Sequence, residues 1–253
     1  MLDLFRLDGA LAVVTGSSQG IGLALAKGLA AYGARVVING RGAGKVAQAV
    51  ESLRRDGYEA HGRVFDAASP VVASAIDAIE AELGPIDILV NNAGMQFRAP
   101  LADFPSDKWE ELLKTNISSV FYTSQATARH MIARGRGKII NIGSVQSELG
   151  RPSIAPYTAT KGAVKNLTRG MCADWARHGL QINGIGPGYF KTPLNQALVD
   201  DPDFTGWLEK RTPAGRWGDV EELIGAAVFL ASPASSFVNG HMLYVDGGIT
   251  TCL

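Results

Sequence analysis

Short apolar runs alternate with longer segments of helical periodicity along the 253-residue chain. Each short run is rich in Val, Ile and Leu and is bounded by turn residues, a pattern typical of strands that are buried on both faces of a parallel sheet. The pattern predicts strands at Leu11–Thr15, Arg35–Asn39, Glu59–Phe65, Ile86–Asn91, Lys138–Ile142, Gln181–Ile185 and Met242–Val245.

Apolar residues recur every three or four positions in the intervening segments, which predicts helices. Between the first two strands, Ile21, Leu25, Leu29 and Tyr32 keep this spacing. Further helices are predicted at Lys45–Arg55, Val71–Leu83, Asp107–Arg134, Tyr157–Arg177 and Val220–Leu230. This alternation predicts the α/β class, as a doubly wound Rossmann-type parallel sheet of about seven strands with helices on both faces.

Residues 186–216 break the alternation. The segment holds four prolines, several glycines and no predicted strand. Long irregular segments inside compact domains are usually functional lids or disordered. Aromatic residues that would anchor a substrate lid favour the first alternative, and they are Tyr189, Phe190, Phe204 and Trp207. We therefore expect a single domain over residues 1–253 with a lid at 186–216.

The charge balance argues against partners that are held by positive charge. Lys and Arg total 24, as do Asp and Glu, so the formal net charge is zero. No basic excess exists to attract nucleic acid or anionic lipid. The composition is 46% hydrophobic, but no run approaches the ~18 consecutive apolar residues of a membrane helix. We expect neither a nucleic-acid partner nor a membrane partner.

The cysteines and histidines suggest no metal site. Cys172 and Cys252 lie far apart and match neither a disulfide framework nor a zinc spacing. The four histidines are scattered. The first residues, "MLDLFRLDGALAVVTG", include Asp3 and Asp8 and lack the regions of a signal peptide. A reducing, cytoplasmic location is the expectation.

A glycine-rich loop, "TGSSQGIG", runs from Thr15 to Gly22 between the first predicted strand and the first helix. Glycines at 16, 20 and 22 permit tight turns and allow backbone N–H groups to approach a pyrophosphate, while the helix N-terminus supplies partial positive charge. The spacing is G-x-x-x-G-x-G, and its position in the chain is the one that a dinucleotide loop requires. The sequence therefore predicts a dinucleotide site here.

The second predicted strand ends in "VVINGR". An acid at this end would accept a hydrogen bond from the 2′-hydroxyl of NAD. Here a neutral Asn39 is followed by Arg41, whose guanidinium suits a 2′-phosphate. The sequence favours NADP; the alternative is that Arg41 is a solvated loop residue, which leaves NAD possible.

Several motifs, taken together and in this order, resemble the short-chain dehydrogenase/reductase family over essentially the whole chain. They are "TGSSQGIG", "NNAG" at 91–94, Asn116, Ser144, "YTATK" from Tyr157 to Lys161, "PG" at 187–188 and "VDGG" at 245–248. The resemblance implies a Rossmann-type oxidoreductase that transfers a hydride between a nicotinamide cofactor and a secondary alcohol or ketone.

The resemblance also implies the cofactor contacts. It assigns Gly16, Ser18, Gln19, Gly20 and Ile21 to the phosphate loop, Asn39 and Arg41 to the adenosine ribose, Asp66 and Ala67 to the adenine, Asn92, Ala93 and Gly94 to the underside of the adenosine, and Pro187, Gly188 and Thr192 to the nicotinamide. Many NADP-using members carry Arg or Lys where this chain has Gln19. Arg41 is therefore the main candidate for the 2′-phosphate.

Tyr157 and Lys161 lie one helical turn apart, so both face the same side of the predicted helix. Reduction of a carbonyl requires a proton at its oxygen, and Tyr157 is predicted to deliver it or, in reverse, to remove it. A phenol has an ordinary pKa of about 10, which Lys161 is expected to lower as a nearby cation. Lys161 is also expected to bind the nicotinamide ribose, and Ser144 to hold the substrate oxygen. Asn116 matches the asparagine that, in this family, holds a water against the catalytic lysine, so the resemblance implies the same role for it.

Three stretches are similar, within the family, to the gluconate 5-dehydrogenases, which interconvert D-gluconate and 5-keto-D-gluconate. They are residues 138–163, 181–194 and 213–249. A sugar acid requires a cation for its carboxylate and polar groups for its hydroxyls. The candidates are Arg98, then Arg151 and Lys191 for the carboxylate, and Gln146 and Glu148 for hydroxyls; each has the alternative of a surface or subunit contact.

Two other functions stay open at this point. One is reduction of a 3-oxoacyl thioester or another ketone with the same catalytic set, and an apolar groove under the lid would favour it. The other is a non-catalytic, cofactor-sensing binding protein, which the intact Ser144, Tyr157 and Lys161 disfavour. The resemblance implies a homotetramer joined through the helices at 107–134 and 157–177 and the last strand.

Overall fold

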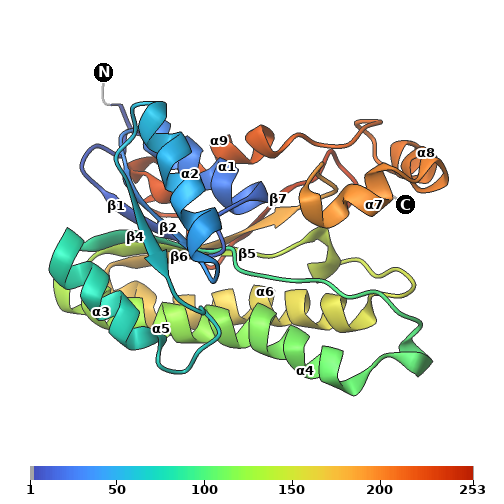
Figure 1. The fold of residues 1–253 in the computed structure, drawn as a ribbon, viewed down its shortest axis with the longest axis horizontal. Helices are drawn as coiled ribbons and strands as arrows, with labels where there is room; N and C mark the ends of the chain where they lie inside the picture. The colour runs from blue at the N-terminus through green and yellow to red at the C-terminus, as the bar shows by residue number, and fades with distance from the viewer. Residues whose placement is uncertain (1–2, 253) are drawn as a thin grey trace.

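The computed structural model describes residues 3–252, and within that range its centre is one sheet of seven parallel strands (Figure 1). The strands are β1 (Leu11–Val14), β2 (Arg35–Gly40), β3 (Ala60–Val64), β4 (Ile86–Asn91), β5 (Gly137–Ile142), β6 (Leu180–Pro187) and β7 (Met242–Val245). Their order is β3-β2-β1-β4-β5-β6-β7. The prediction of a doubly wound parallel sheet is confirmed.

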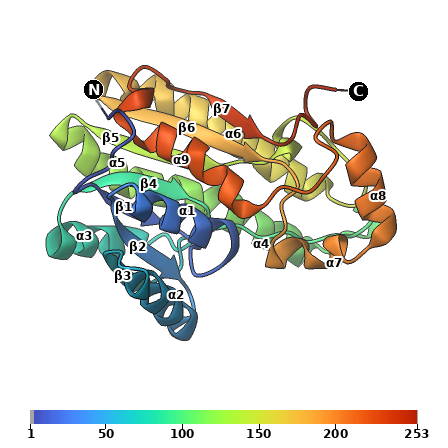
Figure 2. The same cartoon turned by 90° about the horizontal axis from the view of Figure 1, so that it is seen from above.

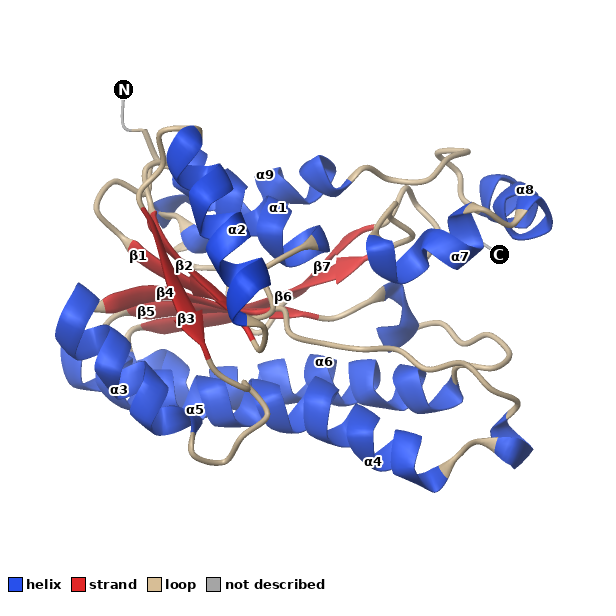
Figure 3. Ribbon diagram, viewed as in Figure 1, coloured by secondary structure: helices blue, strands red, loops and turns tan. Residues whose placement is uncertain are grey.

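Helices cover both faces of the sheet, as Figure 3 shows with helices in blue and strands in red. One face is covered by α1 (Gly20–Ala31), α2 (Ala43–Arg55) and α9 (Ile224–Ala231), and the other by α3 (Val72–Leu83), α4 (Ser106–Leu113), α5 (Ser119–Arg134) and α6 (Ala155–Trp175). Among residues 3–252, no helix has both the length and the apolar character that a membrane span requires.

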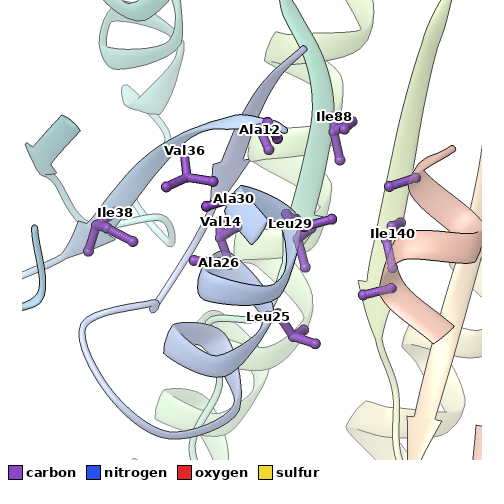
Figure 4. Packing of buried hydrophobic residues seen from close by; sticks show 14 of the residues in the cluster. Ala12, Val14, Leu25, Ala26, Leu29, Ala30, Val36, Ile38, Ile88 and Ile140 are labelled. Carbon is purple, nitrogen blue, oxygen red and sulfur yellow. The ribbon is translucent and has the colours of Figure 1, made fainter. Parts of the chain in front are cut away.

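The alternation of side chains along each strand separates two apolar cores. On β1, Ala12 and Val14 join the core under α1, while Leu11 and Val13 join the core under α5. All four side chains are fully buried, which explains why the strand reads as a continuous apolar run. Figure 4 shows Leu29 of α1 among the strand side chains of the first core. Burying one such leucine contributes about 1.5–3 kcal/mol.

The strand order reverses between β1 and β4, because β2 and β3 lie on one side of β1 and β4 to β7 lie on the other (Figure 2). Connections leave these two neighbouring strands in opposite directions, so a crevice opens at their carboxyl ends. The loops that follow β1, β4, β5 and β6 all begin at this edge. The fold therefore brings four separate segments of the chain to one place.

The structure corrects the sequence predictions in two segments. The helix predicted over 107–134 is divided into α4 and α5 by a turn of π-helix, Lys114–Ser118. The segment 186–216 is more regular than predicted: β6 continues to Pro187, and α7 (Gln196–Val199) and α8 (Pro202–Arg211) follow. The signal for α8 was present in the sequence, because Asp201 caps its N-terminus and proline occupies the first helical position.

Candidate active site

The glycine-rich loop after β1 packs directly on the segment after β4. Gly16 and Gly20 have positive φ angles of 61° and 58°, which glycine adopts without strain. A Cβ added to Gly16 would lie 2.9 Å from Cα of Ala93, and one added to Gly22 would lie 2.7 Å from the Gly16 carbonyl oxygen. Only glycine fits at these two positions, because a larger residue would push the loop away from the segment after β4 or distort the loop itself.

Hydrogen bonds fix this contact. The Thr15 hydroxyl accepts from the backbone N–H groups of Asn92 (3.0 Å) and Ala93 (3.1 Å). The Asn92 amide donates to the carbonyl groups of Thr15 and Gly16, each at 3.0 Å. The two segments are therefore held in a single register.

The N-terminus of α1 is open to a ligand. Its N-cap residue, Gln19, makes no capping hydrogen bond, and the first turn contains no acidic residue. The first N–H groups of the helix thus keep their donor capacity and partial positive charge. These features, with the close-packed glycines, fit the pyrophosphate of a dinucleotide.

Asn39, at the end of β2, is committed to holding the loop. Its side-chain oxygen accepts from Gly16 N at 3.1 Å, and its amide donates to the carbonyl groups of Arg63 (3.3 Å) and Phe65 (3.1 Å). The neighbouring Arg41 is exposed. Lys45, which the sequence analysis missed, donates to the Gln19 side chain at 3.3 Å.

Helix α6 presents Tyr157 and Lys161 to the same cavity. Lys161 Nζ donates to the Ile142 carbonyl oxygen at 2.8 Å and lies 5.7 Å from the centre of the Tyr157 ring. Ser144, two residues after the end of β5, accepts a hydrogen bond from Gln146 N at 3.1 Å. The predicted catalytic side chains are therefore adjacent in space.

Burial shifts the pKa of both side chains toward their neutral forms. Burial raises the pKa of Tyr157 to about 12, although a hydrogen bond with Ser144 acts in the opposite direction. Burial lowers the pKa of Lys161 to about 8. The expectation that Lys161 lowers the pKa of Tyr157 is wrong for this structure, because loss of solvation dominates and the groups that act against it are Ser144 and Arg98.

Asn116 lies within the π-helical turn and outside the cavity lining. Its amide donates to the Met95 carbonyl (3.0 Å) and to the Thr160 hydroxyl (3.1 Å), and its oxygen accepts from Met95 N at 2.8 Å. Turns of this kind are frequent at functional sites. Asn116 thus joins the segment after β4 to the helix that carries Tyr157 and Lys161.

Two arginines, Arg98 and Arg151, line the same cavity. Arg98 donates to the Gln96 side chain at 3.0 Å, and a backbone hydrogen bond from Ala99 to Ser153 (3.2 Å) holds its segment beside that of Arg151. Nε of each arginine is buried without a hydrogen-bond partner among residues 3–252. Burial, and secondarily the charge of Arg151, lowers the pKa of Arg98. Neither arginine forms an ion pair in the described structure.

Most of the predicted site residues line this one cavity. They are Gly16, Gln19, Gly20, Ile21, Asn92, Gly94, Arg98, Ser144, Gln146, Arg151, Tyr157, Lys161, Pro187, Gly188 and Thr192. Predicted residues that do not line it are Ser18, Asn39, Arg41, Asp66, Ala67, Ala93, Asn116, Glu148 and Lys191.

Two of the predicted substrate contacts have other partners. Glu148 forms an ion pair with Lys165 and accepts a hydrogen bond from the Tyr244 hydroxyl at 2.7 Å. Lys191 pairs with Asp219 at 3.3 Å. In contrast, Gln96 and the apolar Leu194 and Leu198 line the cavity, and no spacing in the sequence marks them for this place.

Comparisons with known proteins agree with this geometry. A family model described as enoyl-(acyl carrier protein) reductase matches residues 16–250. The chain is 63% identical to the gluconate 5-dehydrogenase of Gluconobacter oxydans (strain 621H), covering 99% of this chain and 98% of that protein. It is 55% identical to the 5-keto-D-gluconate 5-reductase of Escherichia coli (strain K12), covering 98% of each chain.

A solved structure shares the whole fold. It is a gluconate 5-dehydrogenase from Burkholderia cenocepacia J2315 in complex with NADP and tartrate, which is 62% identical and has a TM-score of 0.98. The similarity covers 100% of this chain and 99% of that one. With the dinucleotide loop, the Tyr157–Lys161 pair in the cavity and these matches, the chain belongs to the short-chain dehydrogenase/reductase family.

Proposed function

We propose that the protein interconverts D-gluconate and 5-keto-D-gluconate with NADP(H) as the preferred cofactor. The names of the relatives at 55–63% identity support the substrate, and the NADP bound by the Burkholderia cenocepacia protein supports the cofactor. The observation that carries the proposal is the pair Arg98 and Arg151, which shares the cavity with Tyr157 and has no carboxylate partner among the described residues.

A sugar acid supplies what this pair lacks. Two guanidinium groups close together repel one another, and a bound carboxylate both removes the repulsion and occupies their free N–H groups. Gln96 and Gln146 also line the cavity, where they can donate to or accept from the hydroxyl groups of the substrate. Glu148 and Lys191 face other partners, so we assign the substrate contacts to the cavity residues.

Tyr157 is the proposed general acid and base, and Ser144 holds the reacting oxygen against it. At neutral pH a phenol with a pKa of about 12 is protonated, which prepares it to protonate the ketone oxygen during reduction. In the oxidation direction its deprotonated form, the phenolate, accepts the proton of the substrate hydroxyl. NADP(H), when bound, accepts or supplies the hydride. Lys161 is positioned to bind the nicotinamide ribose, and Asn116 supports it through Met95 and Thr160.

The preference for the phosphorylated cofactor rests on charge at the end of β2. Asn39 leaves no carboxylate there to repel a 2′-phosphate, and Arg41 is exposed beside it. Lys45 adds a second cation through its contact with Gln19. The remaining cofactor contacts at Ser18, Asp66, Ala67 and Ala93 are proposed from the family pattern.

We also propose a single domain with residues 186–216 as the lid, a homotetramer and a cytoplasmic location. Trp109 of α4 and Phe121 of α5 are 37% and 42% exposed in the isolated chain, and large apolar side chains of this kind favour an interface on that helical face. Cys172 and Cys252 are free, which is consistent with a reducing compartment.

The first prediction is a substrate and cofactor profile. We expect oxidation of D-gluconate with NADP at a kcat/KM at least tenfold higher than with NAD, and little activity on acetoacetyl thioesters. The measurement is an initial-rate screen over sugar acids, polyols and thioesters with both cofactors. Preferred turnover of thioesters would establish the ketone-reductase alternative, and a preference for NAD would overturn the role of Arg41.

The second prediction concerns Tyr157→Phe. Removal of the hydroxyl should lower kcat by about 10²–10⁴-fold, since the proton has no acceptor, while the affinity for NADPH stays within about twofold because the ring is retained. Stopped-flow turnover and fluorescence titration of NADPH measure the two quantities. Substantial turnover in this variant would show that another group moves the proton.

The third prediction concerns the cost of burying Lys161. Its folded pKa of about 8 lies below the ordinary value of 10.5, so between these pH values the unfolded chain binds a proton that the folded chain does not. The penalty to stability is complete below pH 8 and is relieved as the pH rises toward 10.5. Lys161→Met should therefore stabilise the cofactor-free protein by about 1–3 kcal/mol at pH 7 and by much less at pH 10, while turnover is lost.

Lys138→Met is the matched control for this measurement. Burial also lowers the pKa of Lys138 to about 8. This lysine lies at the amino end of β5, whereas the candidate site lies at the carboxyl ends of the strands. The control should show the same pH-dependent gain in the denaturation midpoint and keep its turnover. A Lys161→Met variant that is equally destabilised at both pH values would contradict the argument.

A further inference from the structure

The guanidinium of Arg151 lies on an aromatic ring that belongs to the lid. Its central carbon is 5.3 Å from the centre of the Phe204 ring, within the range of a cation–π contact. Arg151 comes from the loop between β5 and α6, whereas Phe204 comes from α8. The contact therefore joins the wall of the cavity to the segment that we propose as its lid.

Among residues 3–252, the contact found for the Arg151 guanidinium is the one with the Phe204 ring. Nε of Arg151 is buried without a partner, no carboxylate pairs with the guanidinium in that range, and the nearby Arg98 repels it. A cation–π contact with the ring leaves the hydrogen-bonding capacity of the guanidinium unused. Its in-plane N–H groups stay available for the two oxygens of a carboxylate.

The position of Phe204 is itself fixed. Asp201 caps α8 by accepting hydrogen bonds from Asp203 N (3.0 Å) and Phe204 N (3.1 Å). The Phe204 ring also lies 5.7 Å from that of Tyr189 and 6.1 Å from that of the buried Trp217. A ring held in this way gives Arg151 one orientation before substrate arrives, which lowers the ordering cost of binding.

We propose that Phe204 is a positioning residue for the substrate carboxylate: it holds the guanidinium of Arg151 in an orientation that suits the anion. The inference rests on the proposed function, in that a carboxylate is the group that the arginines bind. Phe204 thereby contributes to selection of acids over neutral polyols without touching the reacting carbon.

The test compares three variants in the full-length protein. Phe204→Met keeps an apolar side chain of similar length but removes the ring, and it should raise KM for D-gluconate about tenfold with kcat within about twofold. Phe204→Tyr retains the ring and should restore the wild-type KM. Trp207→Met is the matched control, because Trp207 belongs to the same helix and contacts Phe204 (ring centres 5.3 Å apart) but shows no contact of this kind with Arg151.

A binding measurement separates this inference from the proposed function. Tartrate is titrated calorimetrically into the NADP-loaded variants, and Phe204→Met should bind it about tenfold more weakly than Trp207→Met does, with unchanged affinity for NADP. Equal losses in the two methionine variants would overturn the inference. If the wild type does not oxidise D-gluconate, the proposed function fails, while the tartrate titration still decides the role of Phe204.

Discussion

The site depends on one contact, the close packing of the loop after β1 on the segment after β4. Thr15, Gly16 and Asn92 form its hydrogen bonds, and the missing side chains of Gly16 and Gly22 make the approach possible. The contact spans the point at which the strand order reverses. It sets the place for a cofactor between the two halves of the sheet.

The segment after β4 is also bonded to the other parts of the site. Met95 is bonded to Asn116 in the π-helical turn, and Ala99 is bonded to Ser153 next to Arg151. Asn116 is bonded in turn to Thr160, which precedes Lys161 on α6. Eight consecutive residues, 92–99, thus fix the phosphate loop, the catalytic helix and the arginine pair relative to one another. Because the proposed chemistry requires all three at once, this segment is the framework of the proposed site.

The sequence predicted the strands, and the closeness of Tyr157 and Lys161, well, because both leave local signals. Buried parallel strands are continuous apolar runs, and Tyr157 and Lys161 are one helical turn apart. The π-helical turn leaves no such signal, and the partners of its Asn116, Met95 and Thr160, lie far away in the chain. The pKa of Tyr157 was misjudged for a similar reason: the spacing shows that a cation is near, whereas the burial that dominates depends on the whole fold. Glu148 and Lys191 are polar residues close to the motifs, and only the structure shows that they face other partners.

The central claim is that the paired arginines select a carboxylate. The most direct measurement is the ratio of kcat/KM for D-gluconate to kcat/KM for D-glucitol, its analogue with a neutral hydroxymethyl group, in the wild type and in Arg98→Met. Loss of a charged hydrogen-bonding partner costs about 1.5–3 kcal/mol, so the account predicts that the ratio falls by about 10–100-fold in the variant. The fall should come from kcat/KM for D-gluconate, while kcat/KM for D-glucitol stays unchanged. An unchanged ratio, or an equal loss for both substrates, would contradict it.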